Sequence, residues 1–158
     1  MIFEPLSALR KVQKHIWTIN DALHRIENRE RPRSREANDI WQFEVYGSLL
    51  NSDFEILLVY LQRLKRLIFR IRKEAFQTES CDAILQKFQQ SLPDLTFLRD
   101  VQEHVDEYMV GSGKDASVNP REVMAFGVSP GSLIYLDKKV SVNEVKDVVE
   151  LVIAKLLK

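Results

Sequence analysis

Cysteine is nearly absent from this chain, and its scarcity excludes two ways of stabilising a small protein. Among 158 residues there is one cysteine, Cys81. A single thiol can form no internal disulfide, and it has no partner for a cysteine-based zinc site. Such sparing use of cysteine is typical of a reducing compartment, so we expect a cytoplasmic protein.

An excess of charge of either sign is also missing. The chain carries 23 basic and 23 acidic residues, which gives a formal net charge of zero. This balance argues against strong non-specific binding to nucleic acids, which usually relies on a basic excess, but it leaves room for a local basic patch. A net charge near zero is also compatible with self-association.

Long apolar runs, targeting segments and common catalytic motifs are lacking too. No apolar run reaches the ~20 residues of a membrane span, and residues 1–5 do not resemble the start of a signal peptide. We therefore expect no membrane association. There is no Gly-rich phosphate loop, His-Glu-x-x-His or Gly-x-Ser-x-Gly sequence. His15 and His24 have no acidic or cysteine partner at ligand spacing, so we expect neither a metal nor a cofactor.

What is present is the composition and periodicity of one mainly α-helical domain spanning residues 1–158. Apolar residues make up 45% of the chain, which is ordinary for a globular protein. Apolar residues at spacings of three and four predict helices at about 5–28, 52–75, 80–92 and 95–110, and after Ser141. The predicted helix caps are Ser52 with Glu55, Ser80, Asp94, and Ser141 with Glu144.

Three segments depart from helical spacing. The charged, proline-containing residues 29–36 predict an exposed loop. In residues 41–45 apolar and polar side chains alternate, which favours a short strand, although so brief a run does not exclude a helix. Residues 124–128 and 133–136 flank a Ser-Pro-Gly-Ser turn and predict a β-hairpin. The expected fold is an up-and-down helical bundle with one β-hairpin before the C-terminal helix.

Residues 95–108 carry an arginine followed five positions later by a histidine: Leu-Thr-Phe-Leu-Arg-Asp-Val-Gln-Glu-His-Val-Asp-Glu-Tyr. This Arg-x4-His pattern, with Asp100 directly after Arg99, resembles the HEPN family of helical RNA-cutting and RNA-binding domains. The local likeness extends from Leu95 to Gly113. A second Arg-x4-His, at Arg10, lacks the acidic neighbour.

The resemblance implies a metal-independent endoribonuclease, of the kind found among toxins and defence components, with Arg99, Asp100 and His104 in its active site. The implied partners are RNA, a second copy of the chain in a homodimer, and a cognate antitoxin protein. Some HEPN toxins carry a tyrosine two residues after the histidine, where this chain has Asp106. Many HEPN domains are not enzymes, so the alternative is a non-catalytic dimerisation or protein-interaction module.

Helix geometry limits how these residues can cooperate. On an ideal helix Arg99 and His104 are about 140° apart, so their side chains do not meet automatically. Asp100 lies four positions before His104 on the same face and could orient its imidazole. Arg99 would reach the site by its length or from across a two-fold interface. Without catalysis, Arg99 and Glu103 would form an ordinary ion pair and His104 would pack beside its apolar neighbours.

A basic stripe is the second candidate site, with spacings of three and four: Arg63, Arg66, Arg70 and Lys73. The stripe predicts contacts with an RNA backbone. The bland alternative is an ordinary solvated helix face, which charge stripes usually are. A third possibility is pairing, within the chain or across a dimer, with the acidic residues Asp94, Asp100, Asp106 and Glu107. A third possible function is the binding of a small molecule by the bundle. Only Trp17 and Trp41 would support it, and we expect both in the core.

Overall fold

The computed structural model describes residues 4–32, 40–122 and 126–158. Within these ranges the elements are α1 (Pro5–Asn28), α2 (Ile40–Lys73), α3 (Thr78–Ser91), α4 (Leu95–Glu103), α5 (Val105–Met109), β1 (Phe126–Ser129), β2 (Ser132–Tyr135), β3 (Lys138–Ser141) and α6 (Val142–Leu156). The prediction of a mainly α-helical fold with a small β element before the last helix is confirmed. Residues 33–36 of the expected loop and Met124 of the expected hairpin lie outside the described ranges.

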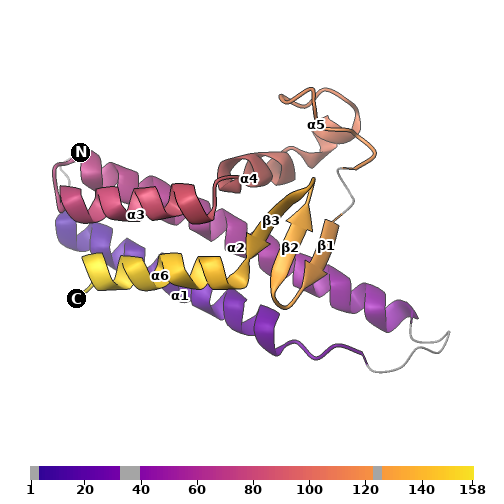
Figure 1. Cartoon of the computed structure of the whole chain (residues 1–158), viewed down its shortest axis with the longest axis horizontal. Coiled ribbons are helices and arrows are strands. Elements are labelled where there is room, and N and C mark those ends of the chain that lie inside the picture. Colours follow the sequence, from indigo (N-terminus) through magenta and orange to yellow (C-terminus); the bar gives the residue numbers. More distant parts are fainter. Residues whose placement is uncertain (1–3, 33–39, 123–125) are drawn as a thin grey trace.

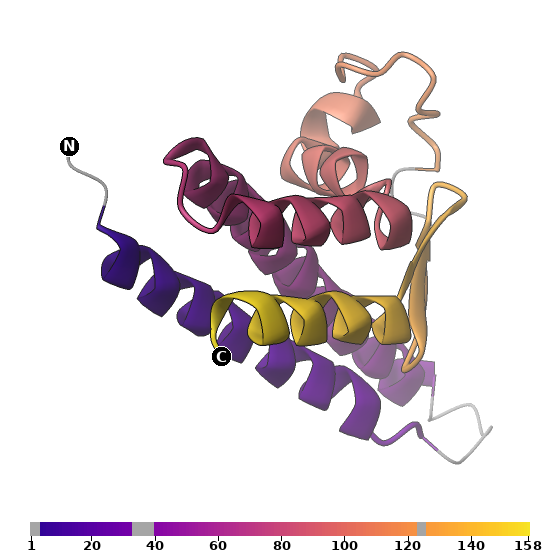
Figure 2. The ribbon, with the colours of Figure 1, turned by 60° about the vertical axis from the view of Figure 1, so that its left-hand side comes forward.

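Four helices, α1, α2, α3 and α6, form the bundle (Figure 1). The long helix α2 is its central element, because it contacts α1, α3, α4 and β1. Helix α6 packs mainly on α3 and also contacts α1. Helices α4 and α5 lie on the side of the bundle away from α1 (Figure 2). The residues of the candidate site come from α1, α2, α4 and the junction of α4 with α5.

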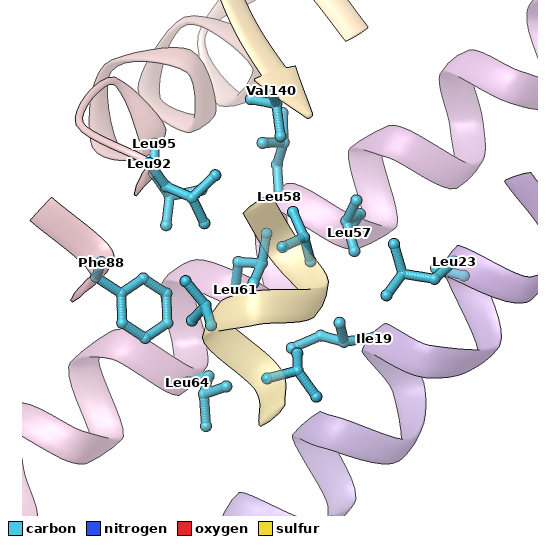
Figure 3. Close-up of a cluster of buried hydrophobic side chains, with 14 of the residues drawn as sticks. Ile19, Leu23, Leu57, Leu58, Leu61, Leu64, Phe88, Leu92, Leu95 and Val140 are labelled. Carbon is cyan, nitrogen blue, oxygen red and sulfur yellow. The ribbon is translucent and has the colours of Figure 1, made fainter. Parts of the chain in front are cut away.

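The core is built around the apolar face of α2 (Figure 3). The leucines that α2 contributes converge with apolar side chains of the other helices and of β3. The labelled members of this buried cluster are Ile19, Leu23, Leu57, Leu58, Leu61, Leu64, Phe88, Leu92, Leu95 and Val140. Burying one such side chain fully contributes ~1.5–3 kcal/mol, so this cluster fixes how the helices pack.

Helix α2 is longer than the sequence predicted. It begins at Ile40, so residues 41–45 form a helix, the state that their alternation disfavoured but did not exclude. Ser52 is an interior residue of α2 rather than its cap, and its hydroxyl donates a hydrogen bond to the Ser48 carbonyl (3.0 Å). Leu50 is fully buried, as is Phe54 one turn later, so the inward face of the helix already exists before Ser52. In the helix the backbone N–H and C=O groups of this run are paired within α2 itself.

The predicted helix from residue 95 to 110 is interrupted at His104. Its φ and ψ angles of −117° and 29° are not helical, and they separate α4 from the short helix α5.

Helix α3 also starts earlier than predicted, at Thr78. Gln77 precedes it with a left-handed φ of 48°, so Ser80 lies inside the helix rather than at its cap.

The sheet has one strand more than the predicted hairpin. Strands β1 and β2 pair antiparallel across the Ser129–Ser132 turn, as expected. Strand β3 adds to β2 through a tight turn in which Leu136 and Asp137 both have positive φ, 49° and 60°. Turns of this type favour Asn-Gly or Asp-Gly at these two positions. The Leu-Asp sequence therefore did not indicate a turn here. The buried side chains of β2 and β3 face the bundle.

Both tryptophans lie at the surface, so the prediction that they belong to the core is wrong. Trp17 is 70% exposed on α1, and Trp41 is 69% exposed near the start of α2.

Within the part of the chain that the structure describes, no helix is both long and apolar enough to cross a bilayer.

Candidate functional site

Arg99 lies on α4 with its side chain 19% exposed, and it forms an ion pair with Glu103 one turn later. Burial is the main cause that lowers its pKa, followed by repulsion from the positive charges of Arg66 and Arg63 on α2. Asp100 opposes this shift. The pKa of an arginine starts so high that the guanidinium remains charged. Arg99 is therefore a half-buried cation in the field of other cations.

His104 is held by a different carboxylate from the one that the sequence suggested. Its Nδ1 lies 3.2 Å from Oε1 of Glu107, within the first turn of α5. Asp100 instead faces Lys114, whose Nζ is 3.6 Å from its carboxylate. The link from His104 back to Asp100 runs through the backbone, where the His104 N–H donates to the Asp100 carbonyl (3.1 Å). Glu107 is thus the residue in position to orient the imidazole.

Tyr108 anchors the loop that follows α5. Its side chain is 3% exposed, and its hydroxyl accepts a hydrogen bond from the Asp115 backbone N–H (3.3 Å). Gly113 packs against the ring so closely that a Cβ there would clash with its carbon atoms. Tyr108 therefore serves the structure of this loop, while Asp106 is exposed at the position where some HEPN toxins carry a tyrosine.

The basic stripe of α2 is exposed along its full length: Arg63, Arg66, Arg70 and Lys73. Within the described ranges, none of the four has a carboxylate at ion-pair distance. Three of the four acidic residues proposed as their partners contact other side chains, since Asp94 pairs with Lys138, Asp100 with Lys114, and Glu107 lies beside His104. Pairing within one chain therefore does not neutralise the stripe.

Helix α1 brings further cations toward the stripe. His15 packs edge-on against Tyr60 of α2, with 5.6 Å between ring centroids. Burial lowers the pKa of His15, and the charges of Arg63, Lys14 and Lys11 lower it further. The guanidinium of Arg63 lies over the same Tyr60 ring, 5.0 Å from its centroid. The half-buried His15 is thus a packing residue between α1 and α2.

Charges of α1 and α2 act together on His15, and charges of α2 act on Arg99 of α4, so we group these basic residues as one cationic surface. We use this name for Lys11, Lys14, Arg63, Arg66, Arg70, Lys73 and Arg99. Sequence reasoning found its α2 and α4 members separately. It missed Lys11 and Lys14, for which the only signal was their three-residue spacing on one helix.

Ligands for a metal ion do not gather in the described ranges, where no group of three or more His, Cys, Asp and Glu side chains comes together. Comparisons of the chain with protein-family models, with curated proteins and with solved structures find no match. The resemblance to HEPN domains therefore stays a prediction. What the site can do has to be inferred from its own residues.

Proposed function

We propose that this chain is a metal-independent endoribonuclease of HEPN type, which binds RNA along the cationic surface and cleaves it at Arg99 and His104. The observation that carries this proposal is the electrostatic proximity of Arg99 to Arg66 and Arg63. The candidate catalytic arginine belongs to the same surface as the candidate phosphate-binding residues. A strand that neutralises the stripe would therefore bring a phosphate to Arg99.

The chemistry would use the 2′-hydroxyl of the RNA as the nucleophile. His104 would accept the hydroxyl proton as the 2′ oxygen attacks phosphorus and the bond to the 5′ oxygen breaks. The products would be a 2′,3′-cyclic phosphate and a 5′-hydroxyl. Glu107 occupies Nδ1 of His104, so Nε2 is the nitrogen left for this proton. Arg99 would exchange Glu103 for the phosphate and stabilise the charge that develops on its oxygens.

A second copy of the chain would complete this site in the homodimer that the resemblance implies. Two-fold symmetry would place a second Arg99 and His104 beside the first pair. The second imidazole could then protonate the departing 5′ oxygen. A cognate antitoxin that covers the cationic surface also stays a prediction.

Cleavage of labelled single-stranded RNA in EDTA tests the proposal. We expect the wild type to release fragments with 2′,3′-cyclic phosphate ends. Arg99→Ala and His104→Ala should be slower by ~100-fold or more, the usual contribution of a donor that stabilises the transition state and of an acid–base group, respectively. Arg10→Ala and His24→Ala are matched controls on exposed α1 residues and should cleave normally. Equal cleavage by all five folded proteins would refute this site, and so would an inactive wild type.

A non-catalytic interaction module is the second candidate function, and one observation favours it. Arg99 and His104 are each paired with a carboxylate of their own neighbourhood, Glu103 and Glu107. Such pairs satisfy both side chains without a substrate. In that case the cationic surface would bind RNA or a protein partner without cutting it. RNA binding by a wild type that cleaves none of a varied set of RNAs would support this candidate.

A further inference from the structure

Phe69 is a large apolar side chain that α2 leaves at the surface, with 47% of it exposed. On a helix, the residues three and four positions away are the nearest surface neighbours. For Phe69 all four of these neighbours are basic: Lys65, Arg66, Arg72 and Lys73. Trp41 on the same helix is also exposed, but its neighbour three positions on is Glu44. The basic surroundings are therefore particular to Phe69.

Most of these cations are available to a ligand. Arg72 is tied to Asp82 of α3. Within the described ranges, Lys65 and Arg66 have no carboxylate at ion-pair distance. The Lys73 ammonium lies 5.0 Å from the Phe69 ring centroid. The ring thus already has a cation over its face.

An aromatic ring among cations matches a ligand that offers both flat rings and phosphates. Single-stranded nucleic acids do this, because their bases stack on aromatic side chains while basic residues follow the backbone. In a duplex the faces of the bases are hidden inside the stack. An exposed cation–π contact is weaker than base–aromatic stacking. A base can therefore displace the Lys73 ammonium, which then becomes free to pair with a phosphate.

The position of Phe69 connects it to the proposed cleavage site. Arg66 lies one helical turn before Phe69, a rise of about 5 Å. Arg66 in turn interacts electrostatically with Arg99 on α4, where its positive charge lowers the pKa of Arg99. A strand with one base on Phe69 would thus have its phosphates led past Arg66 toward Arg99.

We propose that Phe69 stacks on an unpaired base and thereby restricts the cationic surface to single-stranded RNA. This inference rests on the RNA-binding role proposed above and adds the residue that selects the form of RNA. Phe69 is a positioning residue here, since it does not touch the reacting phosphate.

The test compares Phe69→Leu, Phe69→Trp and the control Trp41→Leu. The probes are a labelled 12-nucleotide RNA of mixed sequence, single-stranded or annealed to its complement, with 2′-O-methyl groups that block the proposed cleavage. The readout is the Kd from fluorescence anisotropy. We expect the wild type to prefer the single strand and Phe69→Leu to bind it about tenfold more weakly, the size of a lost stacking contact. Phe69→Trp and Trp41→Leu should bind it normally. Both positions, Phe69 and Trp41, are exposed, so folding should be unaffected.

A second readout follows the ring itself. In a chain carrying Phe69→Trp, Trp17→Phe and Trp41→Phe, the only tryptophan reports on position 69. Oligouridine should quench its fluorescence, because stacking on a base quenches indole emission.

The outcomes separate this inference from the function on which it rests. A wild type that binds no RNA would refute both the stacking role of Phe69 and the RNA-binding function on which it rests. A wild type that binds RNA, with Phe69→Leu binding equally well, removes only the stacking role. If Phe69→Leu instead changes the oligomeric state in sedimentation and leaves RNA affinity unchanged, the surface is a protein interface and the proposal fails.

Discussion

Gly113 shows how much a single residue can determine in the loop after α5. The Tyr108 ring occupies the space that a side chain at position 113 would need. This close contact buries Tyr108 and brings the Asp115 N–H to its hydroxyl. The same loop carries Lys114, the partner of Asp100. Packing at one glycine therefore affects the surroundings of α4.

We expect Gly113→Ala to lower the free energy of unfolding by ~1–3 kcal/mol, the usual cost of overpacking. The added methyl group would force the loop away from Tyr108. Urea denaturation measures the loss, and hydrogen exchange at the Asp115 amide should become faster. Gly47→Ala is the control, because nothing lies within 4 Å of its added Cβ and it is inside α2. That change should stabilise by ~0.5–1 kcal/mol. Gly113→Ala with wild-type stability and amide protection would contradict this account.

At the scale of elements, a cluster of charges fastens α1 to α2. Asp53 of α2 is 4% exposed, and it accepts hydrogen bonds from Arg25 Nε (2.7 Å) and Arg29 Nη2 (2.5 Å). The hydrogen bond with Asp53 is the main cause that raises the pKa of Arg25. Arg25 also pairs with Asp21 on its own helix. This buried carboxylate holds together the two helices that supply most of the cationic surface.

Asp53→Ala should therefore destabilise the fold by about 2 kcal/mol, because it leaves two arginines without their buried acceptor. Urea denaturation followed by circular dichroism measures the change. Asp21→Ala removes only the outer carboxylate, which is 44% exposed. Its effect should stay within ~0.5 kcal/mol, as for surface ion pairs. Equal losses in the two variants would show that the burial of Asp53 contributes nothing.

At the scale of the whole molecule, charge is balanced in number but divided in space. The last part of α2, residues 63–73, holds six basic residues and no acidic one. Its first part, residues 40–62, holds three acidic residues and no basic one. A chain with zero net charge can therefore still present one strongly cationic surface, and binding there should depend on salt.

The salt dependence of RNA binding provides a further prediction. Plots of log Kd against log salt concentration should be linear for single-stranded RNA, with a slope of ~0.7 for each phosphate contacted. Arg66→Ala should lower the slope by about that amount, since it removes one such contact. The control is Lys155→Ala, an exposed residue of α6 outside the cationic surface. Its slope should equal that of the wild type, and an unchanged slope in Arg66→Ala would exclude Arg66 from the interface.

Local spacing was a good guide wherever one helix or one turn decides its own structure. Helix α1 begins at Pro5 and ends at Asn28 as predicted, because its apolar stripe repeats without interruption. The Ser-Pro-Gly-Ser turn likewise predicted the pairing of β1 with β2. The basic spacing on α2 also predicted a stripe that is exposed in the structure.

The sequence by itself determined the helical class, most helix positions, the hairpin and the separate candidate residues, since each depends on neighbours three or four positions away. Only the tertiary structure decided that the helix breaks at His104, that Glu107 rather than Asp100 holds the imidazole, and that both tryptophans are exposed. It also decided that Arg99 joins Arg66 and Arg63 on one surface. These features depend on how α4 and α1 pack against α2, and contacts between distant segments leave no periodic signal in a single chain.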